Sequence, residues 1–154
     1  MSETSRIAKQ LEKTFTGPAW HGPAVEQILD GVTAEVAARP SPAAIHSIWQ
    51  IVDHMTFWEA AVRGWLAGDR TRPADEASWP TISDTSEGAW QATRQRLRET
   101  HQALVVDVAQ LDDARLTERI FDDMPSLYAI LHGVVQHNIY HAGQIALLKK
   151  IAAR

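Results

Sequence analysis

The sequence predicts an all-α protein, an antiparallel four-helix bundle formed as a single domain by residues 1–154. Apolar residues recur at steps of three and four along most of the chain, whereas the alternation that is typical of β-strands is nearly absent. The chain has 154 residues, of which 45% are hydrophobic and 22% charged. This length and composition fit one globular domain with one substantial core. Four segments are long enough to be the main helices of a bundle.

Each predicted main helix has residues that favour its position or its boundaries. Gly17-Pro18 ends the first helix, and Gly68 suits the left-handed residue that closes the second. Ser86 is a suitable N-cap for the third helix. The last helix is apolar on most sides, as expected for the centre of a bundle. The four helices are expected, in order, over about residues 4–15, 44–67, 86–111 and 126–154.

Shorter elements and loops connect these helices. Two short helical stretches are expected at residues 25–32 and 33–38, before a proline-rich loop. Residues 69–85 contain two prolines and several polar residues, and they predict a long excursion over one end of the fold. Loops of this length are uncommon in compact domains unless they have a function. A short connector at residues 116–125 precedes the last helix.

The composition excludes several classes of function. The chain has no cysteine, which excludes disulfides, thiolate metal sites and a cysteine nucleophile, so a metal would need histidine, carboxylate or water ligands. The formal net charge of -4 argues against a nucleic-acid partner, because such proteins carry a basic face. No signal-peptide pattern or membrane-length apolar run is present, and the cytoplasm is therefore the expected location.

Three of the seven histidines are candidate metal ligands. His137 and His141 are four residues apart, so they share one face of the last helix, with Cβ atoms roughly 5–6 Å apart. No glutamate lies between them, so the His-Glu-x-x-His protease motif is absent. His54 interrupts the apolar stripe of the second main helix, and the three can meet at one level of a bundle. A three-histidine site with an open position is typical of catalytic metals, whereas the pattern alone also permits three hydrogen-bonded core histidines.

Several side chains are expected near these histidines from helix phase. Gln50 and Gln144 are expected to orient the nearest imidazole rings or a bound water. His101 lies on the inner stripe of the third helix and is the best candidate for a fourth polar group. His21 lies in a turn that could approach one mouth of the bundle, and Trp58 is expected to line a pocket. No carboxylate has the phase of a ligand, so the sequence identifies no general base.

The segments that carry the histidines resemble two helices of one known family. Residues 47–59, followed by 63–68, are similar to the second helix of the DinB-like family, and residues 137–146 are similar to its last helix. Residues 17–23 resemble one branch of the same family. The order and spacing of these segments are kept over essentially the whole chain. The resemblance implies a four-helix bundle with one divalent metal ion and three histidine ligands, which are here His54, His137 and His141.

The resemblance also implies a type of function. Family members are associated with nickel, zinc, iron or manganese, and we expect nickel or zinc first. Some related enzymes transfer or isomerise low-molecular-weight thiols such as bacillithiol, mycothiol or glutathione. We therefore expect a metal-dependent transferase that uses a thiol cosubstrate, or a metallohydrolase, acting on a small molecule.

The two activities would use the metal differently. It would hold the thiol deprotonated or lower the pKa of a bound water to about 7. Because the chain has no cysteine, any reacting sulfur must arrive with a cosubstrate. Two other interpretations stay open: a bundle that binds a metal or small ligand without turnover, and a metal-free bundle that works as a homodimer.

Overall fold

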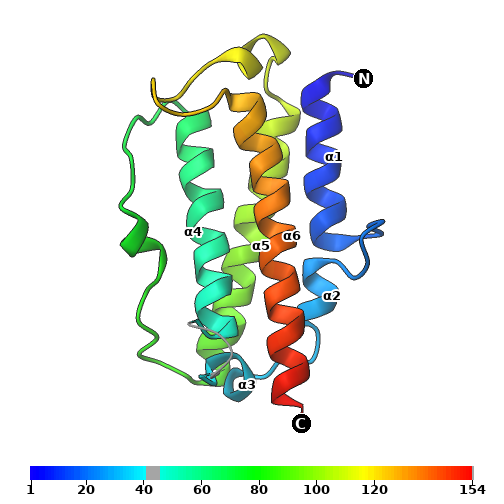
Figure 1. Ribbon diagram of the computed structural model, residues 1–154, viewed down its shortest axis with the longest axis vertical. Coiled ribbons are helices and arrows are strands. Elements are labelled where there is room, and N and C mark those ends of the chain that lie inside the picture. The colour runs from blue at the N-terminus through cyan, green and yellow to red at the C-terminus, as the bar shows by residue number, and fades with distance from the viewer. Residues whose placement is uncertain (41–45, 154) are drawn as a thin grey trace.

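The computed structural model describes residues 1–40 and 46–153, and the regular secondary structure in these residues is helical, with no named strand. The predicted all-α class is therefore confirmed. The four longest helices lie side by side along the long axis of the molecule (Figure 1). They are α1 (Glu3–Thr16), α4 (Ile48–Leu66), α5 (Glu87–Ala109) and α6 (Leu127–Ala152). The shorter elements are α2 (Val25–Leu29), α3 (Ala34–Ala38) and the 3-10 helices η1 (Asp75–Ser78) and η2 (Asp113–Thr117).

The four long helices do not alternate strictly in direction, which corrects the antiparallel prediction. Helix α4 runs opposite to α6, since Glu59 contacts Asn138 while Ile48 lies near Leu148. Helices α4 and α5 run in the same direction, because their contacting positions increase together. These contacts are Trp49 with Thr93, Asp53 with Arg96, Glu59 with His101, and Arg63 with Asp107. Figure 1 shows α1 and α6 both running the other way.

The parallel pair explains the long segment 67–86. The chain must return from the end of α4 to the start of α5, which means covering the length of a 19-residue helix, about 28 Å at 1.5 Å per residue. Figure 1 shows this segment beside α4, with η1 about midway along it. The expected excursion over one end of the fold is therefore wrong. The segment is a crossover that runs along one side of the molecule.

Side-chain caps explain where the helices begin. Ser47 accepts a hydrogen bond from the backbone N–H of Gln50, and the Gln50 side chain accepts one from the backbone N–H of Ser47. This capping box starts α4 at Ile48, later than the predicted residue 44; residues 41–45 lie outside the described residues. Ser86 caps α5 as predicted, through the backbone N–H of Ala89.

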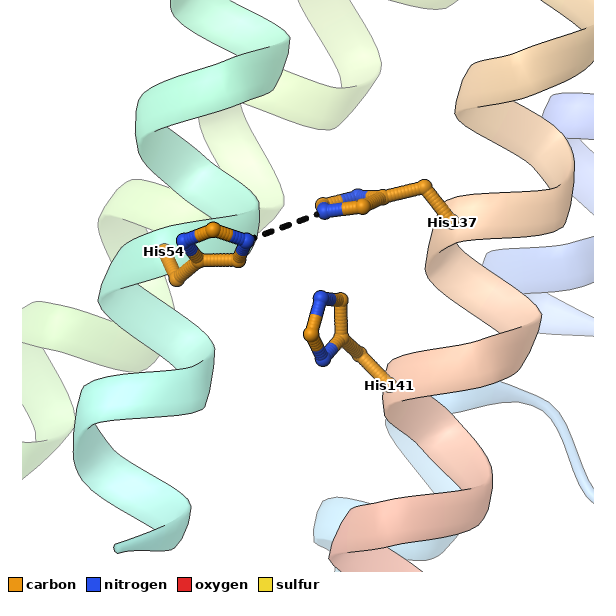
Figure 2. A group of neighbouring side chains, drawn as sticks. All are labelled: His54, His137 and His141. Carbon is orange, nitrogen blue, oxygen red and sulfur yellow. Dashed lines mark hydrogen bonds between the residues drawn. The ribbon is translucent and has the colours of Figure 1, made fainter. Parts of the chain in front are cut away.

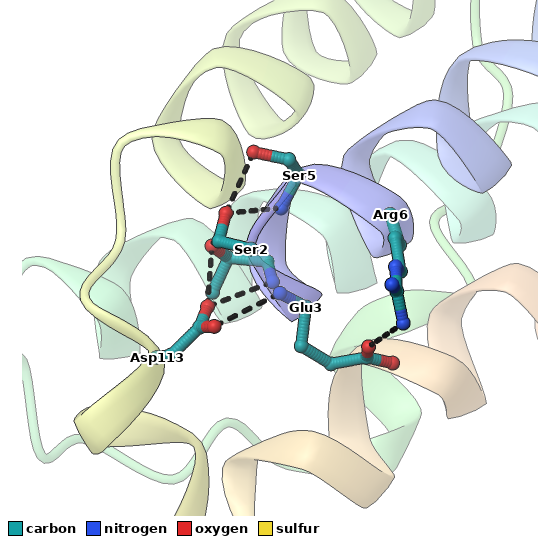
Figure 3. A network of polar contacts seen from close by, with 6 residues as sticks. Ser2, Glu3, Ser5, Arg6 and Asp113 are labelled. Carbon is teal, nitrogen blue, oxygen red and sulfur yellow. Dashed lines mark hydrogen bonds and ion pairs between the residues drawn. The ribbon is translucent and has the colours of Figure 1, made fainter.

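The N-terminus of α1 is attached to η2 by one carboxylate. Asp113 accepts hydrogen bonds from the backbone N–H groups of Glu3 and Thr4, each at 2.9 Å, and from the Thr4 hydroxyl at 2.8 Å (Figure 3). Ser2 caps the same helix through the backbone N–H of Ser5. The first free N–H groups of a helix need such acceptors. Asp113 and Ser2 together therefore keep α1 against the rest of the molecule.

A polar layer divides the apolar core into two halves. The half near α2 and α3 includes Phe15 and Leu97, and the half near η2 includes Leu11 and Leu104. Between them, Glu59 Oε1 accepts a hydrogen bond from the Asn138 amide at 2.7 Å and lies 2.8 Å from His101 Nδ1, with which it shares a hydrogen bond. His101 Nε2 donates to the backbone carbonyl of Leu11 at 3.1 Å. This polar layer therefore connects all four long helices inside the core.

Helix α6 is the longest helix and combines apolar residues with buried polar ones. Its 26 residues include Asn138 and His141, both buried. Across the described residues, no helix combines the length and the apolar character that a membrane crossing requires.

Candidate metal centre

Three imidazole rings converge between α4 and α6 (Figure 2). His54 comes from α4, and His137 and His141 come from successive turns of α6. His54 Nε2 and His137 Nε2 are 3.1 Å apart. The centroid of the His141 ring lies 4.8 Å from that of His54 and 4.4 Å from that of His137. The i, i+4 pair therefore faces a single histidine on the adjacent, oppositely directed helix.

The three rings fit the ligand set of one divalent metal ion. Each ring offers one nitrogen such that the three atoms lie within 4.8 Å of one another. Two nitrogens bound to one ion at about 2.0–2.1 Å lie at most about 4.2 Å apart. The 3.1 Å between His54 and His137 satisfies this limit. At a tetrahedral angle two such nitrogens lie about 3.4 Å apart, and rotation of a side chain can bring a more distant ring to that separation.

Burial keeps the three rings uncharged at neutral pH. Burial, the largest effect, and the repulsion that His54 would meet from the neighbouring histidines in their protonated form lower the pKa of His54 to about 4. The same two causes lower the pKa of His137 to about 4. Burial also lowers the pKa of His141, against the opposing effect of a hydrogen bond to Gln144. Neutral imidazole is the form that binds a metal.

Two of the rings have a hydrogen-bond partner on the side away from the centre. His54 Nδ1 lies 3.0 Å from the Ser78 hydroxyl, and His141 Nδ1 lies 2.6 Å from Gln144 Oε1. The Gln144 amide nitrogen donates to the Tyr140 hydroxyl at 3.2 Å, so its oxygen faces His141. An acceptor at Nδ1 holds the proton there and leaves Nε2 free for a metal.

Aromatic side chains cover the histidines on the crossover side. The Trp79 ring stacks on His54, with centroids 3.8 Å apart and an interplanar angle of 12°. It also stacks on His46 at 3.6 Å. Trp58, which the sequence placed beside the pocket, meets His54 edge-on at 6.4 Å. Trp79 therefore forms the closer wall, and the crossover contributes directly to the surroundings of His54.

Three of the predicted neighbours have contacts or positions other than those expected. Gln50 belongs to the capping box of α4, where its side-chain oxygen accepts a hydrogen bond from the backbone N–H of Ser47. His101 is 2% exposed and belongs to the polar layer, where it also stacks on Phe15 at 4.2 Å. The inner-stripe position is correct for His101, but its ring points toward α1 and Glu59. His21 lies in an exposed turn.

Ser78 is the residue near the site that the sequence analysis missed. It follows no helical periodicity and lies in an otherwise exposed segment, yet its own exposed fraction is 1%. The proximity of Ser78 to His54 results from the direction of α5, which helix phase alone does not determine. The glycines, prolines and polar residues of the crossover indicated only a long loop.

The fold and the three histidines define a helical bundle that fits a metal-binding protein. Residues 19–145 match the family model described as the DinB superfamily. Since this match covers more than half of the chain and includes all three histidines, the protein belongs to the DinB superfamily. Comparisons with curated proteins and with solved structures found no match.

Proposed function

We propose that His54, His137 and His141 bind one divalent metal ion, with nickel or zinc as the first expectation and iron or manganese as further ones. The observation that carries the proposal is the convergence of three uncharged histidine rings from two helices of a DinB-superfamily chain. Histidine nitrogens bind several first-row metals, so the identity of the bound metal depends on the coordination geometry and on which metal is available in the cell.

The proposed activity is that of a metal-dependent enzyme acting on a small molecule, with a low-molecular-weight thiol as cosubstrate. When bound, the metal would supply Lewis-acid chemistry that favours the deprotonated form of a thiol or of water. The group of ligating side chains contains histidine only. This supports a thiol, whose pKa of about 8.5 makes it less dependent on a general base than water is. The second activity that we propose for the same metal site is hydrolysis by a metal-bound water.

The protein itself would hold the histidine rings in position and shield them from water. Gln144 holds the His141 ring through Nδ1, and Trp79 lies flat on the His54 ring. These contacts limit ring rotation and exclude water from one side of the histidines. A site of this kind keeps its ligands in place before a substrate arrives.

A binding protein without turnover is the alternative function. The observation that favours it is the enclosure of the histidines: His54 is 8% exposed and His141 is 5% exposed. A buried site suits storage or sensing of a metal as well as catalysis. A single domain over residues 1–154, a homodimer and a cytoplasmic location stay predictions from the sequence.

Metal analysis of protein purified without an affinity tag tests the metal site. We expect about one divalent ion per chain after loading, lost in His137→Ala and kept in His132→Ala. His132 is the matched control because it lies on another face of α6, against Tyr128. Equal metal content in the two variants would refute the site.

Turnover assays on the loaded protein then separate the two functions. The panel combines thiol cosubstrates with electrophilic acceptors, alongside ester and amide substrates. Turnover that His137→Ala abolishes and His132→Ala retains supports the enzyme. Stable metal binding with no turnover across the panel supports the binding protein.

A further inference from the structure

We propose that the crossover residues 75–79 hold His54 in the form that binds the metal, with Ser78 as the positioning residue. The proposal rests on the metal site described under the proposed function. It assigns a role to a segment that otherwise only connects two parallel helices. The contacts of Ser78, its burial and the stacking of Trp79 carry the inference.

The hydrogen bonds of Ser78 determine which nitrogen of His54 carries the proton. The Ser78 hydroxyl lies 2.6 Å from the backbone carbonyl of Asp75, which can only accept, so the single hydroxyl proton points there. The same oxygen lies 3.0 Å from His54 Nδ1. It must therefore accept from Nδ1–H. In a neutral ring this leaves Nε2 without a proton, and Nε2 is the atom 3.1 Å from His137 Nε2.

The local structure of the crossover keeps the Ser78 hydroxyl in this position. Asp75–Ser78 forms the 3-10 helix η1, in which the backbone N–H of Trp79 donates to the carbonyl of Glu76 at 3.2 Å. Ser78 is 1% exposed, so water competes little for its hydroxyl. The Trp79 ring lies on the face of the His54 ring at 3.8 Å and limits rotation of the imidazole. The turn thus holds both the proton position and the orientation of His54.

The crossover is consequently part of the metal site. Without the Ser78 acceptor, the proton of a neutral His54 is free to lie on Nε2, where it prevents coordination. Metal binding would then require the proton to move and the ring to be ordered. Loss of a partner of this kind typically weakens metal affinity by about 10–100-fold.

The test compares Ser78→Ala with Ser78→Thr, which keeps the hydroxyl, and with Ser83→Ala, an exposed serine of the same crossover. Zn²⁺ affinity is measured by competition with a chelating indicator at neutral pH. We expect Ser78→Ala to bind Zn²⁺ about 10–100-fold more weakly. Ser78→Thr and Ser83→Ala should bind Zn²⁺ nearly as the unchanged protein does.

A spectroscopic measurement separates positioning from a general loss of structure. Nitrogen-15 NMR of the metal-free protein reports which His54 nitrogen carries the proton. We expect Nδ1–H in the unchanged protein and in Ser78→Thr, and a larger share of Nε2–H in Ser78→Ala. A His54 ring protonated at Nε2 in the unchanged protein would overturn the proposal, even if Ser78→Ala failed to fold.

The outcomes distinguish this inference from the proposed function. If His137→Ala retains Zn²⁺, the metal site itself is wrong. If His137→Ala loses Zn²⁺ while Ser78→Ala binds within about threefold of the unchanged protein, below the usual effect of such a partner, only the role of Ser78 is wrong. Loss of affinity in Ser78→Thr and Ser83→Ala alike would also contradict it, because the effect would not depend on the hydroxyl.

Discussion

Replacing His101 by alanine tests the polar layer that joins the four long helices. Glu59 is fully buried, and its carboxyl oxygen Oε1 contacts the His101 ring and the Asn138 amide. The variant removes the ring and its proton, leaving Glu59 with one hydrogen-bond donor. It also removes the His101 hydrogen bond to the Leu11 carbonyl and opens a space beside Phe15. We therefore expect a large loss of stability.

The magnitude follows from the loss of a large buried ring together with its hydrogen bonds. Replacing a large buried aromatic side chain by alanine typically costs about 3–5 kcal/mol. At about 2.1 cal/mol/K per residue, the unfolding entropy of 154 residues is about 0.32 kcal/mol/K, so Tm should fall by about 9–15 °C. The double variant Glu59→Gln/His101→Ala replaces the acidic group by a neutral amide of the same shape, and it should lose less stability than His101→Ala alone.

Calorimetry of the metal-free variants measures this effect, with His21→Ala as the control because His21 is exposed. The control should unfold at the temperature of the unchanged protein. The reasoning is refuted if His101→Ala lowers Tm by less than about 3 °C, roughly 1 kcal/mol. It is also refuted if the double variant is no more stable than His101→Ala. Zn²⁺ affinity should persist in His101→Ala at temperatures where the variant is folded, since His101 lies outside the histidine centre.

Two further predictions concern acid and the start of α1. The metal-free protein should lose stability as pH falls from about 6.5 toward 4. The unfolded chain takes up protons below about 6.5, whereas the pKa values of His54 and His137 in the folded protein are lowered to about 4. Thermal unfolding at pH 7 and pH 5 measures this loss of stability, which should be smaller in His137→Ala. A Tm that rises on acidification would contradict the prediction. Asp113→Ala removes the acceptor that holds the first N–H groups of α1, and this variant should lower the urea midpoint and speed hydrogen exchange in α1. Asp122→Ala, which changes an exposed aspartate, is the control, and equal behaviour of the two variants would count against the cap.

Helical periodicity predicted most of the helices, because burial of one helix face imposes steps of three and four on the sequence. Ser86 and Gly17 marked helix boundaries correctly. In the structure the Ser86 side chain caps the start of α5, and Gly17 ends α1 with a positive φ. The start of α4 was placed too early, since apolar periodicity cannot show where the Ser47 capping box interrupts the chain. The parallel direction of α4 and α5 was also missed, because periodicity identifies a helix face but not the direction in which the helix runs.

The same distinction applies to the residues around the histidines. The spacing of His137 and His141 follows from one helix alone, so sequence reasoning could place both on one face. His54 required a second helix, and the family resemblance supplied that pairing. Helix phase placed His101 on the inner side of its helix but could not show which neighbour its ring contacts. In the structure the ring contacts Glu59 and the Leu11 carbonyl. Ser78 could be found only once the path of the crossover was known.

The parallel pair also creates a region where the protein can change with little risk to its fold. The length of the crossover is set by the helix that it must pass, and most of its residues are exposed. Only a few, among them Ser78 and Trp79, contact the interior. Substitutions elsewhere in the crossover can therefore alter what approaches the histidines without disturbing the helices that carry them. For protein engineering, we therefore expect this segment to be the place where substitutions change ligand specificity while the helices stay the same.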